Sequence, residues 1–194
     1  ESPRRLADML TAGTGVAYLR VGSSAGDPTD WNIQGALTSA DISSWVLSGA
    51  YAARSASGHQ YDLGVSYSTQ QYSGGNPLAL RDVTDGSRNV GSIRGFDRMI
   101  VAPGVALSYG MRYERYDYLD HGNLLSPRFG VELMPSWARI RADVSSRALA
   151  PGAEEFLPPG EAGLLLPPQR TFSAADRGRH LRAERANQAT VTVE

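Results

Sequence analysis

The sequence contains no cysteine and no lysine among its 194 residues. The lack of cysteine excludes a disulfide framework and thiolate metal sites. All 19 side chains counted as Lys or Arg are arginines, and 20 acidic side chains almost balance them. This balance gives no support for a nucleic-acid partner. No apolar run is long enough for a transmembrane helix, so residence in a membrane would require a β-barrel.

Signals at the two ends are also missing. The chain has no initiating methionine and no recognisable signal peptide, and Thr192-Val193-Glu194 lie within strand-like sequence. We therefore expect the chain to be an internal piece of a longer protein. Residues 1–13 are expected to be a loop or a disordered end, because the first residues of a chain are commonly poorly ordered.

Period-two alternation is the main pattern in the rest of the chain. In the run 105–118 the odd positions are largely apolar or aromatic, and most even positions are small or charged. Successive side chains of a strand point to opposite faces, so this pattern predicts a strand with one apolar and one polar face. The same alternation recurs in further runs, at 16–21, 31–37, 43–56, 59–72, 89–101, 124–134, 137–149 and at the C-terminal end. The sequence thus predicts an all-β, antiparallel meander of long strands, about eight or nine in number.

The length of the strands favours a transmembrane barrel over a soluble sheet. Runs of about a dozen residues exceed the usual five or six and suit tilted membrane strands of roughly nine to eleven. The polar faces carry Gly and Ser beside Arg and Glu, which is typical of a barrel lumen. A soluble β-sandwich that binds glycans or proteins remains an alternative, because alternation alone is compatible with it. A small self-contained outer-membrane barrel with a structural or adhesion role is another.

Three neighbouring segments resemble a known family. They are Gly95–Met99 (GFDRM), Leu107–Glu114 (LSYGMRYE) and Leu125–Gly130 (LSPRFG). These segments resemble the barrel of TonB-dependent outer-membrane receptors, especially the subgroup with a carboxypeptidase-regulatory-like domain. Met99 departs from the family pattern, which more often has Trp there. The resemblance extends from about Ser44 to Thr171.

The resemblance carries expectations for the whole chain. Residues 14–194 would be part of a receptor barrel, with long extracellular loops at 73–88 and 150–176. The parent protein would bind a scarce solute and import it across the outer membrane of a Gram-negative-type cell. Its partners would be outer-membrane lipid, a plug domain and TonB, and neither the plug nor the TonB-contacting motif is recognisable in this chain. Four strands between the two loops would place the turns at Pro103-Gly104 and Pro135-Ser136 together on the periplasmic side.

Alternation assigns two sets of candidate site residues. Charged side chains of the polar faces are expected to face the lumen, where they would line a route for an anionic ligand or pair across adjacent strands and hold the wall in register. We favour pairing, with Arg128/Glu132 and Arg139/Asp143 on the right face for it. The lumen-facing candidates are Arg112, Glu114, Arg128, Glu132, Arg139, Arg141 and Asp143. The candidates for aromatic girdles at the membrane surfaces are Trp45, Tyr116, Tyr118 and Trp137.

Catalytic and metal-binding patterns are not found in the sequence. The histidines His59, His121 and His180 are far apart and have no metal-ligand spacing. Glu154-Glu155 has no nearby partner for acid/base chemistry. No nucleophile elbow, Walker loop or dinucleotide fingerprint is present. We therefore expect a non-enzymatic protein without a cofactor or a bound metal.

Overall fold

The computed structural model describes residues 15–23, 29–39, 42–55, 57–72, 87–153 and 181–194, and these residues form nine β-strands. The strands are β1 (Gly15–Gly22), β2 (Thr29–Ser39), β3 (Ile42–Arg54), β4 (His59–Tyr72), β5 (Ser87–Ala102), β6 (Val105–Tyr116), β7 (Asn123–Leu133), β8 (Ile140–Leu149) and β9 (Glu184–Val193).

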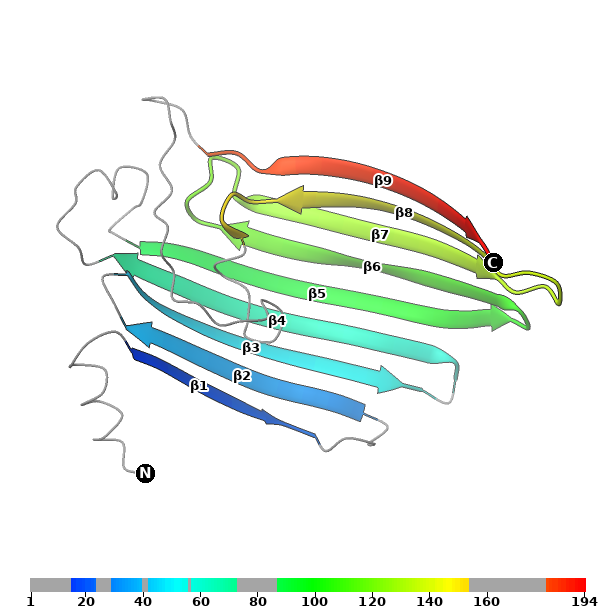
Figure 1. Cartoon of the computed structure of the whole chain (residues 1–194), viewed down its shortest axis with the longest axis horizontal. Coiled ribbons are helices and arrows are strands. Elements are labelled where there is room, and N and C mark those ends of the chain that lie inside the picture. The colour runs from blue at the N-terminus through cyan, green and yellow to red at the C-terminus, as the bar shows by residue number, and fades with distance from the viewer. Residues whose placement is uncertain (1–14, 24–28, 40–41, 56, 73–86, 154–180) are drawn as a thin grey trace.

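All nine strands belong to one antiparallel sheet (Figure 1). Each strand pairs with the strands before and after it in the chain, so the spatial order is β1 to β9. Within the described residues, β1 pairs only with β2 and β9 only with β8, and the sheet is therefore not closed into a barrel. The predicted all-β antiparallel meander is confirmed.

One end of the sheet, which we call the short-turn edge, carries the β1–β2, β3–β4, β5–β6 and β7–β8 connections, which have two to six residues each. The β5–β6 connection consists of Pro103 and Gly104 alone. Gly104 has a φ of 75°, a left-handed conformation that glycine adopts without steric cost. The turn between β7 and β8, which contains Pro135 and Ser136, lies at the same edge. The two predicted turns thus share one end of the sheet.

The opposite end, which we call the long-loop edge, carries the two longest connections, from β4 to β5 and from β8 to β9, together with the short β2–β3 and β6–β7 connections. The central parts of the two longest connections, 73–86 and 154–180, lie outside the described residues. The predicted loops 73–88 and 150–176 fall mostly there, although Ser87 already belongs to β5. The prediction for residues 1–13 also lies outside the described residues.

Most strand boundaries lie one or two residues from the predicted ones, and β6 and β8 illustrate why. β8 begins at Ile140 rather than at Trp137, because Pro135 and Ala138 close a turn through a 3.4 Å hydrogen bond from the Ala138 amide to the Pro135 carbonyl. β6 ends at Tyr116 rather than at Tyr118, where the chain turns toward β7. Both strands are shortened by local turn formation, which alternation does not report.

The register places the alternating residues of all strands on two continuous faces. Tyr109 lies opposite Asp97 of β5 and Phe129 of β7, whereas the next residue, Gly110, lies opposite Phe96 and Arg128. We call the first face apolar, because it carries residues such as Leu47, Val65, Ile93, Met111, Phe129 and Val144. We call the second face polar, because it carries residues such as Ser48, Ser66, Arg94, Arg112, Arg128 and Asp143.

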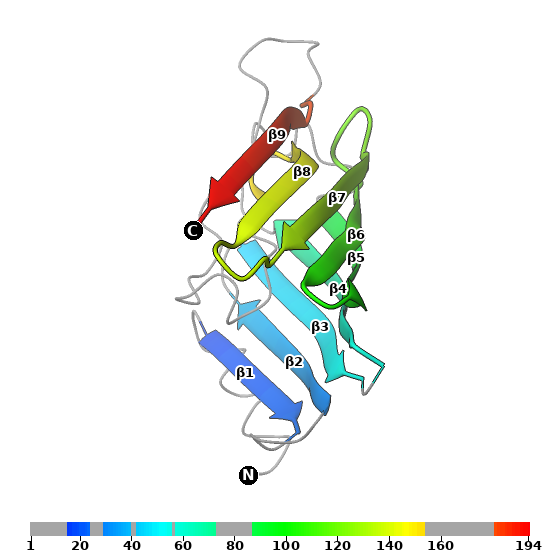
Figure 2. The same ribbon diagram turned by 90° about the vertical axis from the view of Figure 1, so that its right-hand side faces the viewer.

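The sheet curls so that its polar face is concave. Figure 2 shows the middle strands at the back of the curl, with β1 and β9 both turned toward the same side. A hollow on the polar face is lined by Arg20 of β1 and Arg141 of β8, which lie near opposite edges of the sheet. Residues from strands near both edges of the sheet line the same hollow, because the twist of the strands curves a wide sheet around one of its faces.

A small apolar cluster closes the polar face at the long-loop edge. Val90, Tyr116, Tyr118 and Leu124 are buried in it, at 2–9% exposed, with Leu119, Ala148 and Ala150 beside them. The Tyr118 hydroxyl donates to the Pro151 carbonyl at 2.8 Å. This cluster ties the ends of β5, β6 and β7 to the start of the connection that follows β8.

Strand length is a further property of the fold. β4 has 14 residues and β5 has 16, which correspond to about 46 and 53 Å at roughly 3.3 Å per residue. Within the described part of the chain, no helix has the length and apolar character needed to cross a membrane.

Candidate functional site on the polar face

The predicted lumen-facing residues lie together on the polar face. Arg112 and Glu114 are on β6, Arg128 and Glu132 on β7, and the register places Arg141 opposite Glu132. Asp143 of β8 lies opposite Gly130, and Arg139, just before β8, contacts Glu132. Whether this face lines a lumen stays a prediction.

Glu132 of β7 binds two arginines, one on β5 and one in the turn just before β8. Its Oε2 accepts a hydrogen bond from Nη2 of Arg98 at 2.7 Å, and its Oε1 is paired with the guanidinium of Arg139. Arg98 is on β5, so it reaches Glu132 across the intervening strand β6. The residue of β6 opposite Glu132 is the small, buried Ala106, which leaves space for this contact.

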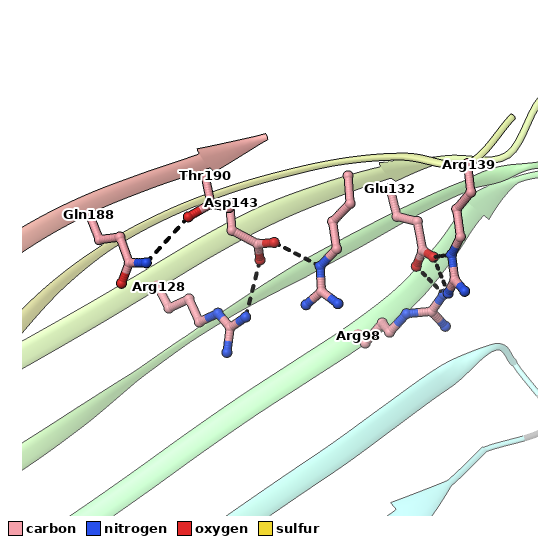
Figure 3. A network of polar contacts seen from close by, with 8 residues as sticks. Arg98, Arg128, Glu132, Arg139, Asp143, Gln188 and Thr190 are labelled. Atoms are coloured by element: carbon pink, nitrogen blue, oxygen red, sulfur yellow. Dashed lines mark hydrogen bonds and ion pairs between the residues drawn. The ribbon is translucent and has the colours of Figure 1, made fainter. Parts of the chain in front are cut away.

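Asp143 forms a second group of the same design (Figure 3). Its Oδ1 lies 3.2 Å from Nη2 of Arg128 on β7, and its Oδ2 lies 2.7 Å from Nε of Arg141 on its own strand. The opposite Gly130 has no side chain between them: a Cβ there would lie 2.6 Å from the Asp143 carboxylate. Each of the two carboxylates therefore binds two guanidinium groups.

The partners within these groups differ from the expected ones. Arg128 pairs with Asp143 rather than Glu132, and Arg139 pairs with Glu132 rather than Asp143. Residues four apart in a strand, such as Arg128 and Glu132, are about 13 Å apart along it, whereas opposite residues on neighbouring strands are about 5 Å apart. Cross-strand neighbours therefore determine the pairs.

The centre of the polar face contains two further arginines at opposite positions. Arg94 and Arg112 face each other across β5 and β6, an arrangement of like charges that is unfavourable unless acids are near. Asp62 lies 3.3 Å from Arg94, and Glu114 lies 3.9 Å from Arg112. The Arg94 stem covers Gly64, where a Cβ would lie 2.8 Å from Arg94 Nε.

The apolar face is exposed over the width of the sheet. Leu47, Val65 and Ile93, from three successive strands, are 53–61% exposed. Aromatic side chains gather on this face toward both ends of the strands. Toward the short-turn edge lie Trp31, Tyr51, Tyr61 and Tyr109, and toward the long-loop edge lie Trp45, Tyr67 and Tyr113.

The four predicted girdle residues occupy different environments. Trp45 lies on the apolar face, where its ring is 5.3 Å from that of Tyr67, and Trp137 is 77% exposed in the turn at the short-turn edge. Tyr116 and Tyr118 lie instead in the buried cluster at the long-loop edge. Tyr116 is two residues from Glu114 and lies on the same face of β6, where its hydroxyl donates to Glu114 at 3.1 Å. Because both tyrosines are buried in the cluster, they do not contribute to an outer aromatic row.

A polar cluster on the apolar face was not predicted from the sequence. Asp97 is 8% exposed, and its Oδ2 lies 2.7 Å from Nδ1 of His59 and accepts a hydrogen bond from the Tyr109 hydroxyl at 2.8 Å. The three members of this cluster, His59 of β4, Asp97 of β5 and Tyr109 of β6, join three neighbouring strands. The signal available in the sequence was the parity of Asp97, which places a carboxylate among the apolar residues of β5.

The described residues contain no group of three or more metal-ligating side chains. The contacts that the polar face does show are charged hydrogen bonds, in which guanidinium groups hold carboxylates.

Comparisons with known proteins assign no family to this chain. No family model matches it, and neither a curated protein nor a solved structure matches it. What defines its class is the fold: a nine-stranded antiparallel meander with one exposed apolar face and one charged, concave face.

Proposed function

We propose that the chain is a segment of an outer-membrane β-barrel wall. The observation that carries this proposal is the continuous apolar face, on which large side chains from β1 to β9 remain exposed. Soluble monomers rarely expose contiguous apolar patches beyond a few hundred Å². A barrel in a membrane accounts for such a face, because lipid contacts the outside while charged residues line the inside.

The connections and aromatic residues support the same proposal. The β5–β6 and β7–β8 connections at one edge are shorter than the β4–β5 and β8–β9 connections at the other, although β2–β3 at that second edge has only two residues. Short turns on one side and long loops on the other are typical of outer-membrane barrels, in which the short turns are periplasmic. Tyr61 and Tyr67 of β4 lie six residues apart, about 20 Å along the strand, with Leu63 and Val65 between them. Aromatic residues on both sides of an apolar stretch are typical of membrane-spanning strands.

The parent protein, in this proposal, is a TonB-dependent receptor that binds a scarce solute and imports it across the outer membrane of a Gram-negative-type cell. This step rests on the resemblance of Gly95–Met99, Leu107–Glu114 and Leu125–Gly130 to that family. The plug domain and TonB are partners of the full-length parent, and outer-membrane lipid is the partner of this wall. The role is binding and transport, without catalysis.

A soluble β-sandwich is the less favoured alternative. A sandwich buries its apolar face against a second sheet, whereas all strands of the described residues belong to one sheet. A self-contained small barrel would pair its first and last strands, and β1 and β9 are not paired.

Lipid contact can be tested with a pair of adjacent tryptophans. In a background in which Trp31, Trp45 and Trp137 are replaced by Phe, Val65→Trp puts an indole on the apolar face and Ser66→Trp puts one on the polar face. After refolding into liposomes that contain brominated acyl chains, the fluorescence of Val65→Trp is expected to be quenched and blue-shifted. Ser66→Trp is the matched control and is expected to keep its emission. Equal quenching of the two variants, or none in either, contradicts the proposal.

A further inference from the structure

The concave polar face encloses a hollow of about 1350 Å³ toward the short-turn edge. This volume exceeds the roughly 300–1,000 Å³ of ordinary small-molecule sites, so it admits a solute together with water. Its walls come from β1 to β8, and most of the lining residues have polar side chains, although polar and apolar surface contribute about equally. Five arginines line it: Arg20, Arg54, Arg98, Arg128 and Arg141.

The arginines of the hollow outnumber the acids that neutralise them. Arg128 and Arg141 share the single carboxylate of Asp143. Arg98 likewise shares Glu132 with Arg139. Each group of two guanidiniums and one carboxylate carries one surplus positive charge.

Two of the five arginines have no acidic partner at all among the residues that the structure describes. Arg20 on β1 and Arg54 at the end of β3 form no ion pair there, and both are exposed. The lining aspartates do not compensate for them. Asp62 is paired with Arg94, and the Asp97 carboxylate binds His59 and Tyr109 on the other face.

The last lining aspartate is Asp30, whose Oδ1 accepts a hydrogen bond from the Ser23 hydroxyl at 3.1 Å. Among the residues that the structure describes, one carboxylate thus remains for Arg20 and Arg54 together, and the lining carries surplus positive charge although the whole chain has a formal net charge of −1. Concave walls of low dielectric concentrate such a field and attract ions of opposite charge.

We propose that this hollow binds a small multivalent anion that carries carboxylate or phosphate groups. Guanidinium forks match the paired oxygens of both groups and bind them through two hydrogen bonds at once. Arg20 and Arg54 supply the free donors, while Arg98, Arg128 and Arg141 are held in place by Glu132 and Asp143. The inference rests on the proposed transport function, since it names the class of solute that passes along this wall.

The test measures anion binding by isothermal titration calorimetry on the full chain in an uncharged detergent. Citrate and pyrophosphate are the two probes, and binding of one but not the other identifies carboxylate or phosphate as the preferred group. The double variant Arg20→Gln/Arg54→Gln is expected to weaken binding at least about tenfold, because each lost guanidinium removes a charge-assisted contact. Higher salt is expected to weaken binding by the wild-type chain as well.

The control removes two arginines that lie away from the hollow. Arg115→Gln/Arg185→Gln lowers the net charge equally and is expected to leave the affinity unchanged. Far-UV circular dichroism of both variants verifies that the sheet is retained, and the single variant Arg54→Gln gives a second, milder measurement. The absence of binding by either probe, or equal weakening in the control, would overturn the inference.

The outcomes separate this inference from the proposed function. Tryptophan quenching by lipid without anion binding leaves the membrane wall in place and removes the anion site. Anion binding without lipid contact retains the site and removes the membrane wall.

Discussion

Replacing Glu132 by Gln tests whether the polar networks stabilise the sheet. The variant keeps the size of the side chain but removes the charge that joins Arg98 on β5 to Arg139 beside β8. The new amide keeps one oxygen acceptor and places an NH₂ donor at the other position, so one of the two guanidiniums loses its acceptor. We expect that arginine to lie beside an NH₂ donor. Glu132 is only 7% exposed, so this position is largely shielded from water.

The magnitude follows from the burial of each contact. A hydrogen bond to a charged group contributes about 1.5–3 kcal/mol, and the Arg98 side chain is 31% exposed, so about 1.5 kcal/mol is expected for that contact. The Arg139 side chain is 54% exposed, which reduces its pair to about 0.5 kcal/mol. Because the amide oxygen still accepts from one guanidinium, the free energy of unfolding should decrease by about 1–2 kcal/mol.

The assay is urea unfolding in detergent or liposomes, followed by tryptophan emission. A double-mutant cycle with Arg98→Gln isolates the pair, and a coupling of about 1 kcal/mol is expected for residues in direct contact. A loss below about 0.5 kcal/mol for Glu132→Gln, together with no coupling to Arg98, would refute the reasoning and show that solvent screens the network completely.

Three further variants test other parts of the sheet by the same unfolding assay. Gly110→Ala should lower the free energy of unfolding by about 1–3 kcal/mol, because its Cβ would lie 2.3 Å from a backbone carbonyl oxygen. Gly91→Ala is the control and should be tolerated, because the nearest contact of its Cβ is at 3.8 Å. Equal losses in the two variants would contradict the steric argument. Tyr109→Phe should cost about 1–2 kcal/mol, because it removes a donor from the buried carboxylate of Asp97; an unchanged midpoint would mean that water replaces the hydroxyl. Met111→Arg should cost about 2–4 kcal/mol in liposomes if the apolar face contacts lipid, and a neutral effect there would count against the membrane wall.

Alternation was sufficient to predict the strands and the division of residues between the two faces. The reason is geometric: the side-chain direction changes with every residue, so parity alone places Arg112 and Arg128 together. The same rule would also have placed Tyr116 with Glu114 on the polar face. The prediction that Tyr116 belongs to an outer girdle followed its residue type rather than its parity.

The ion-pair partners and the Asp97 cluster could not be predicted in the same way. Partners depend on the register between strands, which the hydrophobic pattern of both strands and the turn geometry set together. They also depend on small residues such as Ala106, which leaves space for the contact above it. The contact from Arg98 to Glu132 also crosses an intervening strand. Asp97, for its part, is accommodated on the apolar face only because His59 and Tyr109 arrive on neighbouring strands.

The sequential order of the nine strands has a consequence for how this sheet can be completed. Each strand of a meander reverses direction, so β1 and β9 point the same way. Joined directly, their two free edges would form a parallel seam, unlike every other pairing in the sheet. An all-antiparallel ring therefore needs an odd number of additional strands between β9 and β1, whether one chain or several supply them.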